Sequence, residues 1–257
     1  MFLSNPSGKE ARKKEELLNI SDIIRLDGTR CPYPPPASVL TVVQDCATGS
    51  LREVEKAKEL AKAVAELFGV SEANICVCCC PAAAYACEGI NVRDRSALLR
   101  EEQADLRENT VHLYDLGRCF GLPGVNAWVL IAPKETASAL AAICARLKIS
   151  PPDRVASAAV LAAISDPENV EKWRSMVENT LRRAQLLLNE NGFVTTVGEG
   201  PYLDIKIPAP NRAFLELLQC GIAVGTGKGH IRVWAGTEEE MERFYYCLFK
   251  MKERILS

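Results

Sequence analysis

The stretch that decides the fold is Asp115-Leu116-Gly117-Arg118-Cys119-Phe120-Gly121-Leu122-Pro123-Gly124. Three glycines and a proline fall between Gly117 and Gly124, a composition that favours a loop over regular structure. Short apolar runs of the kind found in buried strands flank it, at 111–114 and 128–131. The stretch therefore predicts a tight loop between two central strands of an α/β protein.

Helices and further strands are predicted on both sides of this loop. A helix that starts at Ser50 has one apolar face and ends at Gly69 as its C-cap. Asp166-Pro167-Glu168 starts a long helix that ends at Asn191-Gly192. Thr237 and Glu240 form a capping box for a final helix. Other expected elements are helices opening at 82 and near 212–219, and strands at 73–77, 193–197, 202–207 and 231–234.

Composition narrows the class of protein. At 257 residues, 48% hydrophobic and 25% charged, the chain is long enough for two domains and is not disordered. A net charge of -2 argues against a nucleic-acid binder. The longest apolar run, 155–164, is far shorter than the ~20 residues that span a bilayer. Eleven cysteines without an apparent secretory signal favour reduced thiols in the cytoplasm.

Three segments, 26–36, 115–124 and 230–239, carry a family resemblance. In this order they resemble the class I/II aminotransferases, pyridoxal-phosphate enzymes of fold type I, and the histidinol-phosphate aminotransferase branch is the most similar. The segment 115–124 resembles the branch's cofactor-lysine loop. The likeness spans roughly residues 23–255 and breaks between Glu88 and Val111, where charged sequence replaces a run of central strands.

The resemblance implies a reduced fold-type-I aminotransferase, with a shortened large α/β domain and an α+β small domain built from both chain ends. The expected divisions are a polar N-terminal helix or arm (1–22), a connector belonging to the small lobe (23–44), the large domain (45–150), and a connecting helix with the C-terminal small domain (151–257). Because the family is dimeric, the resemblance implies a homodimer, a heterodimer with an intact relative, or a larger assembly.

The resemblance also shows which cofactor-binding residues differ. Arg118 stands at the position of the cofactor lysine, and a guanidinium with a pKa above ~12 is no usable nucleophile. Cys80 and Pro81 fall in the phosphate-binding turn, where Pro81 removes a backbone donor. Asn126 replaces the phosphate-binding arginine, and no position matches the residues that hold the pyridine ring. Lys134 is the one nearby lysine that offers an alternative amine.

Arg232 matches the arginine that clamps the substrate carboxylate in the family. It either keeps a carboxylate site or pairs with a small-domain acid such as Asp204, and we favour the pairing. Tyr33 matches a residue that reaches the neighbouring subunit's cofactor phosphate, but we favour a packing role for it. Arg118 either holds an anion in the vacated pocket or forms an ion pair at the surface or at an interface, and we favour the ion pair.

The cysteine run Cys76-Val77-Cys78-Cys79-Cys80 raises the question of a metal site. Alternate cysteines on a strand lie ~6.5–7 Å apart, which is wider than one zinc ion requires, so we favour core packing and expect no metal. Cys119 is the cysteine to examine for thiolate character, because it neighbours Arg118. Residues 225–229 (Gly-Thr-Gly-Lys-Gly) fail the phosphate-loop pattern and are expected to be a loop before the Arg232 strand.

Two functions of different classes follow. The first is a degenerate, non-catalytic aminotransferase-fold protein without cofactor that acts as a structural, regulatory or assembly subunit. The second is a pyridoxal-phosphate-dependent aminotransferase-like enzyme for an amino acid or amino-acid phosphate, with Arg232 as its carboxylate clamp. A third hypothesis, a mis-spliced or truncated gene product, predicts a chain that is poorly stable alone. If the absence of the family's central strands between Glu88 and Val111 leaves strand edges open, the assembly role is favoured, because open edges pair with other chains.

Overall fold

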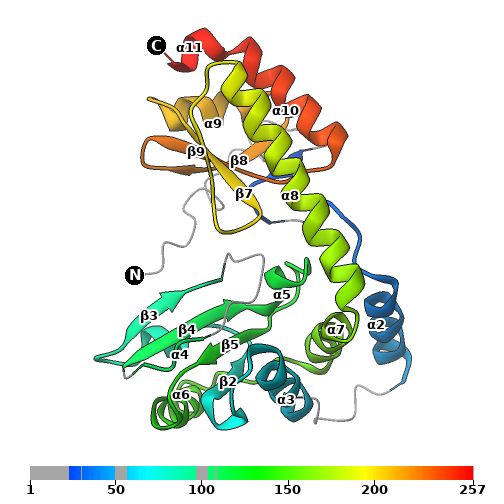
Figure 1. Cartoon of the computed structure of the whole chain (residues 1–257), viewed down its shortest axis with the longest axis vertical. Coiled ribbons are helices and arrows are strands. Elements are labelled where there is room, and N and C mark those ends of the chain that lie inside the picture. Colours follow the sequence, from blue (N-terminus) through cyan, green and yellow to red (C-terminus); the bar gives the residue numbers. More distant parts are fainter. Residues whose placement is uncertain (1–22, 30, 50–56, 97–103, 108, 257) are drawn as a thin grey trace. The chain divides into compact units, whose positions relative to one another are not determined.

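The computed structural model describes residues 23–29, 31–49, 57–96, 104–107 and 109–256 (Figure 1). The arm expected at 1–22 and the first turns of the helix expected from Ser50 lie outside the described residues. The chain divides into two compact units. Unit 2 runs from Pro34 to Trp173, and unit 1 combines the described residues up to Tyr33 with those from Arg174 onward.

Unit 2 contains a four-stranded sheet in the order β2-β5-β4-β3. Strand β5 is antiparallel to both of its neighbours, and β3 is parallel to β4. The elements of this unit are α2 (Ala37–Gly49), α3 (Ala57–Phe68), η1 (Glu72–Asn74), β2 (Ile75–Cys78), α4 (Ala82–Tyr85), β3 (Asn91–Asp94), β4 (Thr110–Asp115), α5 (Leu116–Cys119), β5 (Trp128–Ile131), α6 (Lys134–Arg146) and α7 (Arg154–Ile164).

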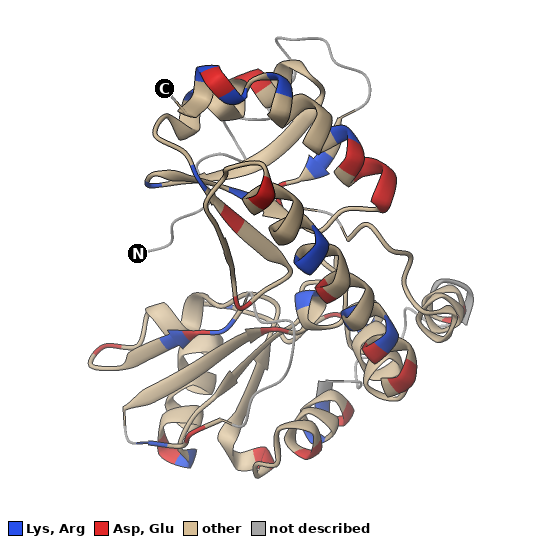
Figure 2. Ribbon diagram, turned by 45° about the horizontal axis from the view of Figure 1, so that its top comes forward, with Lys and Arg blue, Asp and Glu red and all other residues tan. Residues whose placement is uncertain are grey.

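Helices cover both faces of this sheet, because its strands alternate apolar residues between two clusters. Val129 and Ile131 of β5 face α2, α3 and α7, whereas Leu130 faces α4 and α6. Charged residues are absent from β5, and β4 has only Asp115 at its end, as Figure 2 shows for the ribbon. The result is a three-layer α/β unit with an apolar centre.

Unit 2 extends beyond the expected domain 45–150 at both ends. Helix α7 packs on α2 and on α3, so residues from Pro34 and up to Trp173 belong to the same core. Most of helix α2 falls in the connector expected at 23–44, which was assigned to the small lobe, whereas the structure has α2 in unit 2. Strand β3 lies in the segment for which the sequence predicted no element. Two of the four β3 residues are charged and two are exposed, which hides the usual apolar pattern of a strand.

Helix α8 (Pro167–Glu190) passes from unit 2 into unit 1 and confirms the long helix predicted from Asp166. Its end is also as predicted, because Gly192 adopts a φ of 80° and the Phe193 N–H donates to the Leu188 carbonyl. The other elements of unit 1 are β1 (Ile24–Leu26), β6 (Thr195–Val197), β7 (Tyr202–Lys206), α9 (Pro210–Gln219), β8 (Ile222–Gly227), β9 (His230–Trp234), α10 (Glu238–Lys250) and α11 (Lys252–Leu256).

Unit 1 contains a five-stranded sheet in the order β1-β8-β9-β7-β6. Strand β1 pairs in parallel with β8, so this unit combines residues from early and late in the sequence. The capping box of α10 is present, with Thr237 and Glu240 bonding reciprocally. One face of β7 and β9 is buried, and alternate residues place a polar set on the other face. The buried residues are Leu203, Ile205, Ile231 and Val233; the other face holds Tyr202, Asp204, Arg232 and Trp234.

Candidate functional site

Arg118 forms an ion pair at the end of the central strand β4. The Asp115 carboxylate caps helix α5 by accepting the Arg118 N–H at 3.1 Å, and the Arg118 Nε lies 3.2 Å from Asp115 Oδ2. The Asp115 side chain is 10% exposed, and burial raises its pKa to about 6 against the lowering effect of Arg118. The favoured interpretation of Arg118 as an ion-pairing residue therefore has a specific partner.

The loop after Arg118 is a tightly closed turn. A side chain at Gly117 would put its Cβ 2.4 Å from the Val125 carbonyl oxygen, so only glycine fits there. The Leu122 N–H donates to the Gly117 carbonyl at 2.6 Å, and the Leu116 N–H donates to Ala127 at 2.9 Å. These bonds fix the backbone on both sides of Arg118.

The turn that resembles the phosphate-binding turn lies between β2 and α4. The Cys79 N–H donates to the Ser150 carbonyl at 3.0 Å, and the Cys78 thiol donates to the Cys80 carbonyl at 3.0 Å. Pro81 is buried at the N-terminus of α4, which has four residues, and caps it without a side-chain bond. Backbone groups of this turn are thus used within unit 2.

The remaining predicted residues of unit 2 have different surroundings. Asn126 is exposed in the loop before β5, and Lys134 is exposed as the first residue of α6. Cys119 is fully buried in the core cluster that includes Phe120 and Val129. Its side chain therefore packs as a small hydrophobic group, and solvent does not reach it.

Arg232 makes a bidentate ion pair with Asp204 across the β7–β9 register. Its Nε lies 2.8 Å from Oδ1 and its Nη2 lies 2.9 Å from Oδ2. The guanidinium also stacks on the Tyr202 ring, 3.9 Å from the centroid, and the bonds to Asp204 raise the pKa of Arg232. The structural pairing favoured from the sequence is present.

The glycine-rich segment before Arg232 is a hairpin and not the expected loop. Gly225 and Gly227 belong to β8 and pair with β9. A Cβ on Gly227 would lie 2.2 Å from the His230 ring, so this glycine makes room for a side chain of the paired strand. The glycines at 225 and 227 are thus explained by the close approach of β9 side chains, and no phosphate-binding role is needed to account for them.

Tyr33 has the packing contact that we favoured. Its hydroxyl lies 3.2 Å from the Thr180 hydroxyl on α8, within unit 1. The candidate residues are therefore divided between the units. Unit 2 holds Cys80, Pro81, Arg118 and Asn126, and unit 1 holds Tyr33 and Arg232.

Comparisons with known proteins point to one group of enzymes. No family model matches the chain. Over 147 residues the chain is 30% identical to histidinol-phosphate aminotransferase 2 of Carboxydothermus hydrogenoformans, covering 54% of this chain and 39% of that protein. Over 150 residues it is 26% identical to the histidinol-phosphate aminotransferase of Akkermansia muciniphila, covering 56% and 40%. The match spans less than half the length of these curated relatives.

Solved structures resemble the chain over nearly its whole length. Histidinol-phosphate aminotransferase from Sinorhizobium meliloti in complex with pyridoxal 5'-phosphate superposes with a TM-score of 0.77 at 14% identity, covering 99% of this chain and 98% of that one. Aspartate aminotransferase from Thermus thermophilus with maleate gives 0.72 at 18% identity, covering 96% and 97%. The chain has the fold of the fold-type-I aminotransferases. Both the resemblance and the fold class predicted from the sequence are confirmed.

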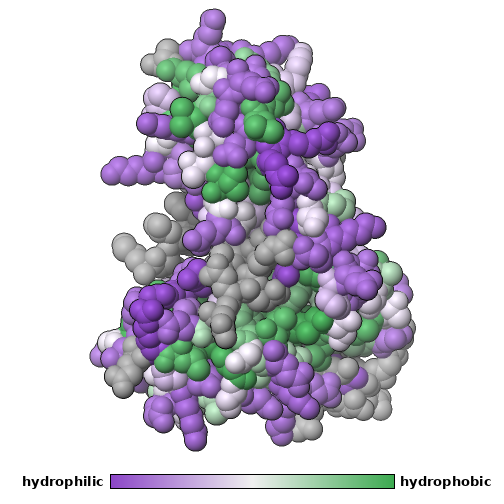
Figure 3. All heavy atoms as spheres, viewed as in Figure 1, coloured by the Kyte–Doolittle hydropathy of each residue, from purple (hydrophilic) through white to green (hydrophobic). Residues whose placement is uncertain are grey.

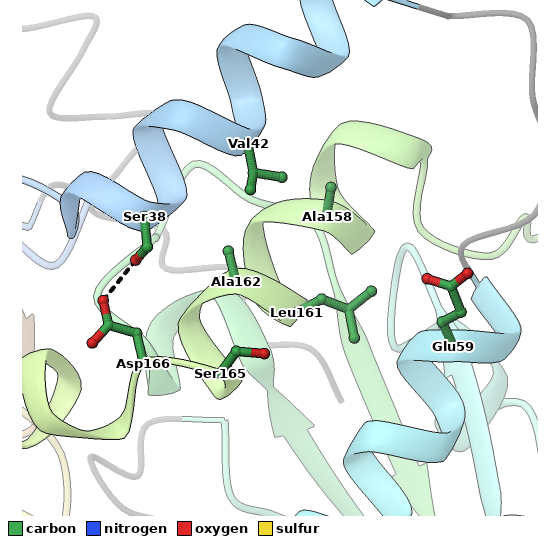
Figure 4. Close-up of a pocket in the computed structure, with 8 residues that line it drawn as sticks. All are labelled: Ser38, Val42, Glu59, Ala158, Leu161, Ala162, Ser165 and Asp166. Atoms are coloured by element: carbon green, nitrogen blue, oxygen red, sulfur yellow. Dashed lines mark hydrogen bonds between the residues drawn. The ribbon is translucent and has the colours of Figure 1, made fainter.

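This aminotransferase-fold chain also has a pocket that the sequence analysis missed. A cavity of about 540 Å³ lies among α2, α3 and α7 in unit 2 (Figure 4). Val42, Ala158, Leu161 and Ala162 supply apolar walls, and Ser38 donates a 2.7 Å hydrogen bond to Asp166 at one end. Only two alanines of the alanine-rich helix α7, Ala158 and Ala162, line it, and no sequence motif marks them.

The surface of the described chain has exposed hydrophobic residues on several elements. Leu40 lies on α2, Leu186 on α8 and Tyr246 on α10. Figure 3 shows hydrophobic and hydrophilic residues side by side on one face of the chain. Within the described ranges, no helix is long and apolar enough to cross a membrane. The same residues contain no group of three or more His, Cys, Asp or Glu placed to hold a metal ion.

Proposed function

We propose that this chain is a degenerate aminotransferase-fold protein that does not catalyse pyridoxal-phosphate-dependent transamination and acts as a structural, regulatory or assembly subunit. The observation that supports the proposal is the ion pair between Asp115 and Arg118, the residue that the family resemblance aligns with the cofactor lysine. The cofactor, when bound in such enzymes, acts as an electron sink for the amino acid. That chemistry starts from a neutral lysine amine, which Arg118 cannot supply.

The ion pair with Asp115 holds the Arg118 side chain at the end of β4. A guanidinium is positively charged at neutral pH, and the Arg118 Nε lies 3.2 Å from Asp115 Oδ2. Asp115 also holds the Arg118 backbone by accepting its N–H. We therefore assign Arg118 a structural role in closing the turn after β4.

The turn around Pro81 supports the absence of cofactor. A phosphate group needs several free N–H donors at the start of a helix. Pro81 has no N–H, and the Cys79 N–H already donates to Ser150. The residues present do not fit pyridoxal phosphate, so we derive no reaction step through it and propose that the chain binds none.

The contacts of Arg232 support the same conclusion for the substrate. Two of its nitrogens donate to the two Asp204 carboxylate oxygens, so a substrate carboxylate would have to displace Asp204. Arg232 and Tyr33 are accordingly assigned to packing within unit 1.

The partners and location belong to the proposal as well. Proteins with this fold form dimers, so we propose a homodimer, a heterodimer with an intact relative, or a place in a larger assembly. We place the chain in the cytoplasm, because none of the eleven cysteines, all within the described residues, is in a disulfide. Neither a nucleic acid nor a membrane is part of the proposed function.

Reduction with borohydride in the presence of pyridoxal phosphate tests the proposal. The visible spectrum should lack an aldimine band, and mass spectrometry should find no stoichiometric pyridoxyl group on the chain. Arg118→Lys is the matched variant, and it should also remain unlabelled because the Pro81 turn offers no phosphate site. Stoichiometric labelling of one lysine in the wild-type chain, at Lys134 for example, would overturn the proposal. Light scattering on the same sample gives the oligomeric state.

The second candidate function is an aminotransferase-like enzyme for an amino acid or amino-acid phosphate. The matches to two histidinol-phosphate aminotransferases over more than half of this chain favour it. It requires another amine, such as Lys134, and release of Arg232 from Asp204. Turnover of an amino donor that is lost in both Lys134→Ala and Arg232→Ala would establish it in place of the first.

A further inference from the structure

A group of thiols lies on the face of β2 that packs against α6. Cys76 and Cys78 are alternate residues of the strand and are both buried, and Cys144 projects from α6 into the same core cluster. The Sγ atoms of Cys76 and Cys144 lie 3.9 Å apart, although the residues are 68 positions apart in the sequence. Nothing in the proposed function uses these thiols.

We propose that Cys76 and Cys144 are an oxidisable pair that closes into a disulfide between β2 and α6 on reaction with a small-molecule disulfide such as oxidised glutathione. This inference goes beyond the proposed function and does not depend on it. A disulfide bond is about 2.05 Å long, so the two sulfur atoms must approach by about 2 Å. Side-chain rotation on a strand and on an adjoining helix is the movement required.

Cys78 also lies close enough to Cys144 to interact with it, but its thiol has a second partner. The Cys78 thiol donates to the Cys80 carbonyl at 3.0 Å, which directs it along the turn. The Cys79 backbone is fixed by its bond to Ser150. Cys119 lies in the core cluster on the opposite face of the sheet and cannot reach Cys144. Cys76 is thus the partner of Cys144 that the geometry favours.

The exchange balances in two steps. The Cys144 thiolate attacks one sulfur of the small disulfide, breaks its S–S bond and releases one small thiolate, which takes up a proton. The Cys76 thiolate then attacks the Cys144 sulfur of the mixed disulfide and releases the second small thiolate, which takes up the other proton. Two protein thiols are oxidised, and one small disulfide is reduced to two thiols.

Burial makes this reaction slow at neutral pH. It raises the pKa of Cys76 to about 12 and also raises that of Cys144, so both thiols are protonated in the resting protein. Closure of the pair therefore requires prolonged exposure to the small disulfide. Closure links an edge strand to its covering helix and should raise the melting temperature of the chain.

Peptide mapping tests the proposal, because trypsin separates Cys76 and Cys144 into different peptides. Trypsin cuts after Lys134 and Arg146, leaving Cys144 as the single cysteine of the peptide 135–146, whereas Cys76 lies in the peptide 63–93. The full chain is incubated with oxidised glutathione, the remaining thiols are alkylated, and the digest is examined by mass spectrometry. The two peptides should appear linked, and fragmentation of the linked species should place the bond at Cys76.

Matched variants separate the partners. The link should disappear in Cys76→Ala and persist in Cys78→Ala, with circular dichroism to show that both variants fold. If either variant fails to fold, fragmentation of the wild-type linked peptide still assigns the bond. A bond at Cys78, a Cys144 that carries only glutathione, or an unmodified Cys144 would each overturn the proposal.

Discussion

Asp115→Asn should remove a specific dependence of stability on pH. The Asp115 carboxyl is buried, and its pKa is raised from 3.8 to about 6 in the folded chain. Between these values the unfolded chain has released the proton while the folded chain still holds it. The free energy of unfolding of the wild type should therefore fall as the pH rises from 4 to 6. At about 1.4 kcal/mol for each pH unit, this loss comes to about 3 kcal/mol.

Urea denaturation at a series of pH values from 3.5 to 7.5 measures this effect, with tryptophan fluorescence as the signal. Trp128 lies opposite Asp115 in the β4–β5 register and reports on unfolding of this sheet. Asparagine keeps the cap of α5 but does not ionise, so the difference between wild type and variant isolates the carboxyl. The wild type should lose about 3 kcal/mol relative to Asp115→Asn between pH 4 and pH 7. A constant difference, or a wild type that gains stability over this range, would refute the reasoning.

Two further predictions concern the turn after Arg118 and the ion pair of Arg232. Gly117→Ala should lower the free energy of unfolding by about 2 to 3 kcal/mol, because its Cβ would meet the Val125 carbonyl oxygen. Gly124→Ala is the control, because a Cβ there has no neighbour within 4 Å, and it should change the free energy of unfolding by less than about 0.5 kcal/mol. Equal effects in urea denaturation would contradict this account of the turn. Arg232→Ala should lower the free energy of unfolding by about 1 kcal/mol. The loss is small because solvent screens the ion pair of the 36% exposed Arg232 side chain. Arg232→Lys should show a smaller loss, and a neutral Arg232→Ala would mean that the pair contributes nothing to folding.

Local signals in the sequence predicted the ends of helices well. The start of α8 at Pro167 and the capping box of α10 depend on residues within one turn, so the sequence contains the whole interaction. Helix α2 was missed because its stability comes from packing on α7, more than a hundred residues away. Strand β3 was missed for a related reason, since it depends on pairing with β4.

The candidate site shows the same division. The pairing of Arg232 with Asp204 could be anticipated, because both were expected on strands of one sheet. For Arg118 an ion pair was favoured without a named partner, although Asp115 is only three residues away. The contact between Cys76 and Cys144 brings together residues 68 positions apart, and no local pattern encodes it.

The parallel pairing of β1 with β8 has a consequence for synthesis of the chain. Ile24 is made early but pairs with Ile222, so β1 cannot complete its sheet until roughly 200 further residues have been translated. At about 5 to 20 residues per second, that interval is roughly 10 to 40 seconds. Unit 2 is continuous in sequence from Pro34 to Trp173 and can form within this interval. A nascent chain released before Val224 would leave β1 without the strand that it pairs with in the sheet.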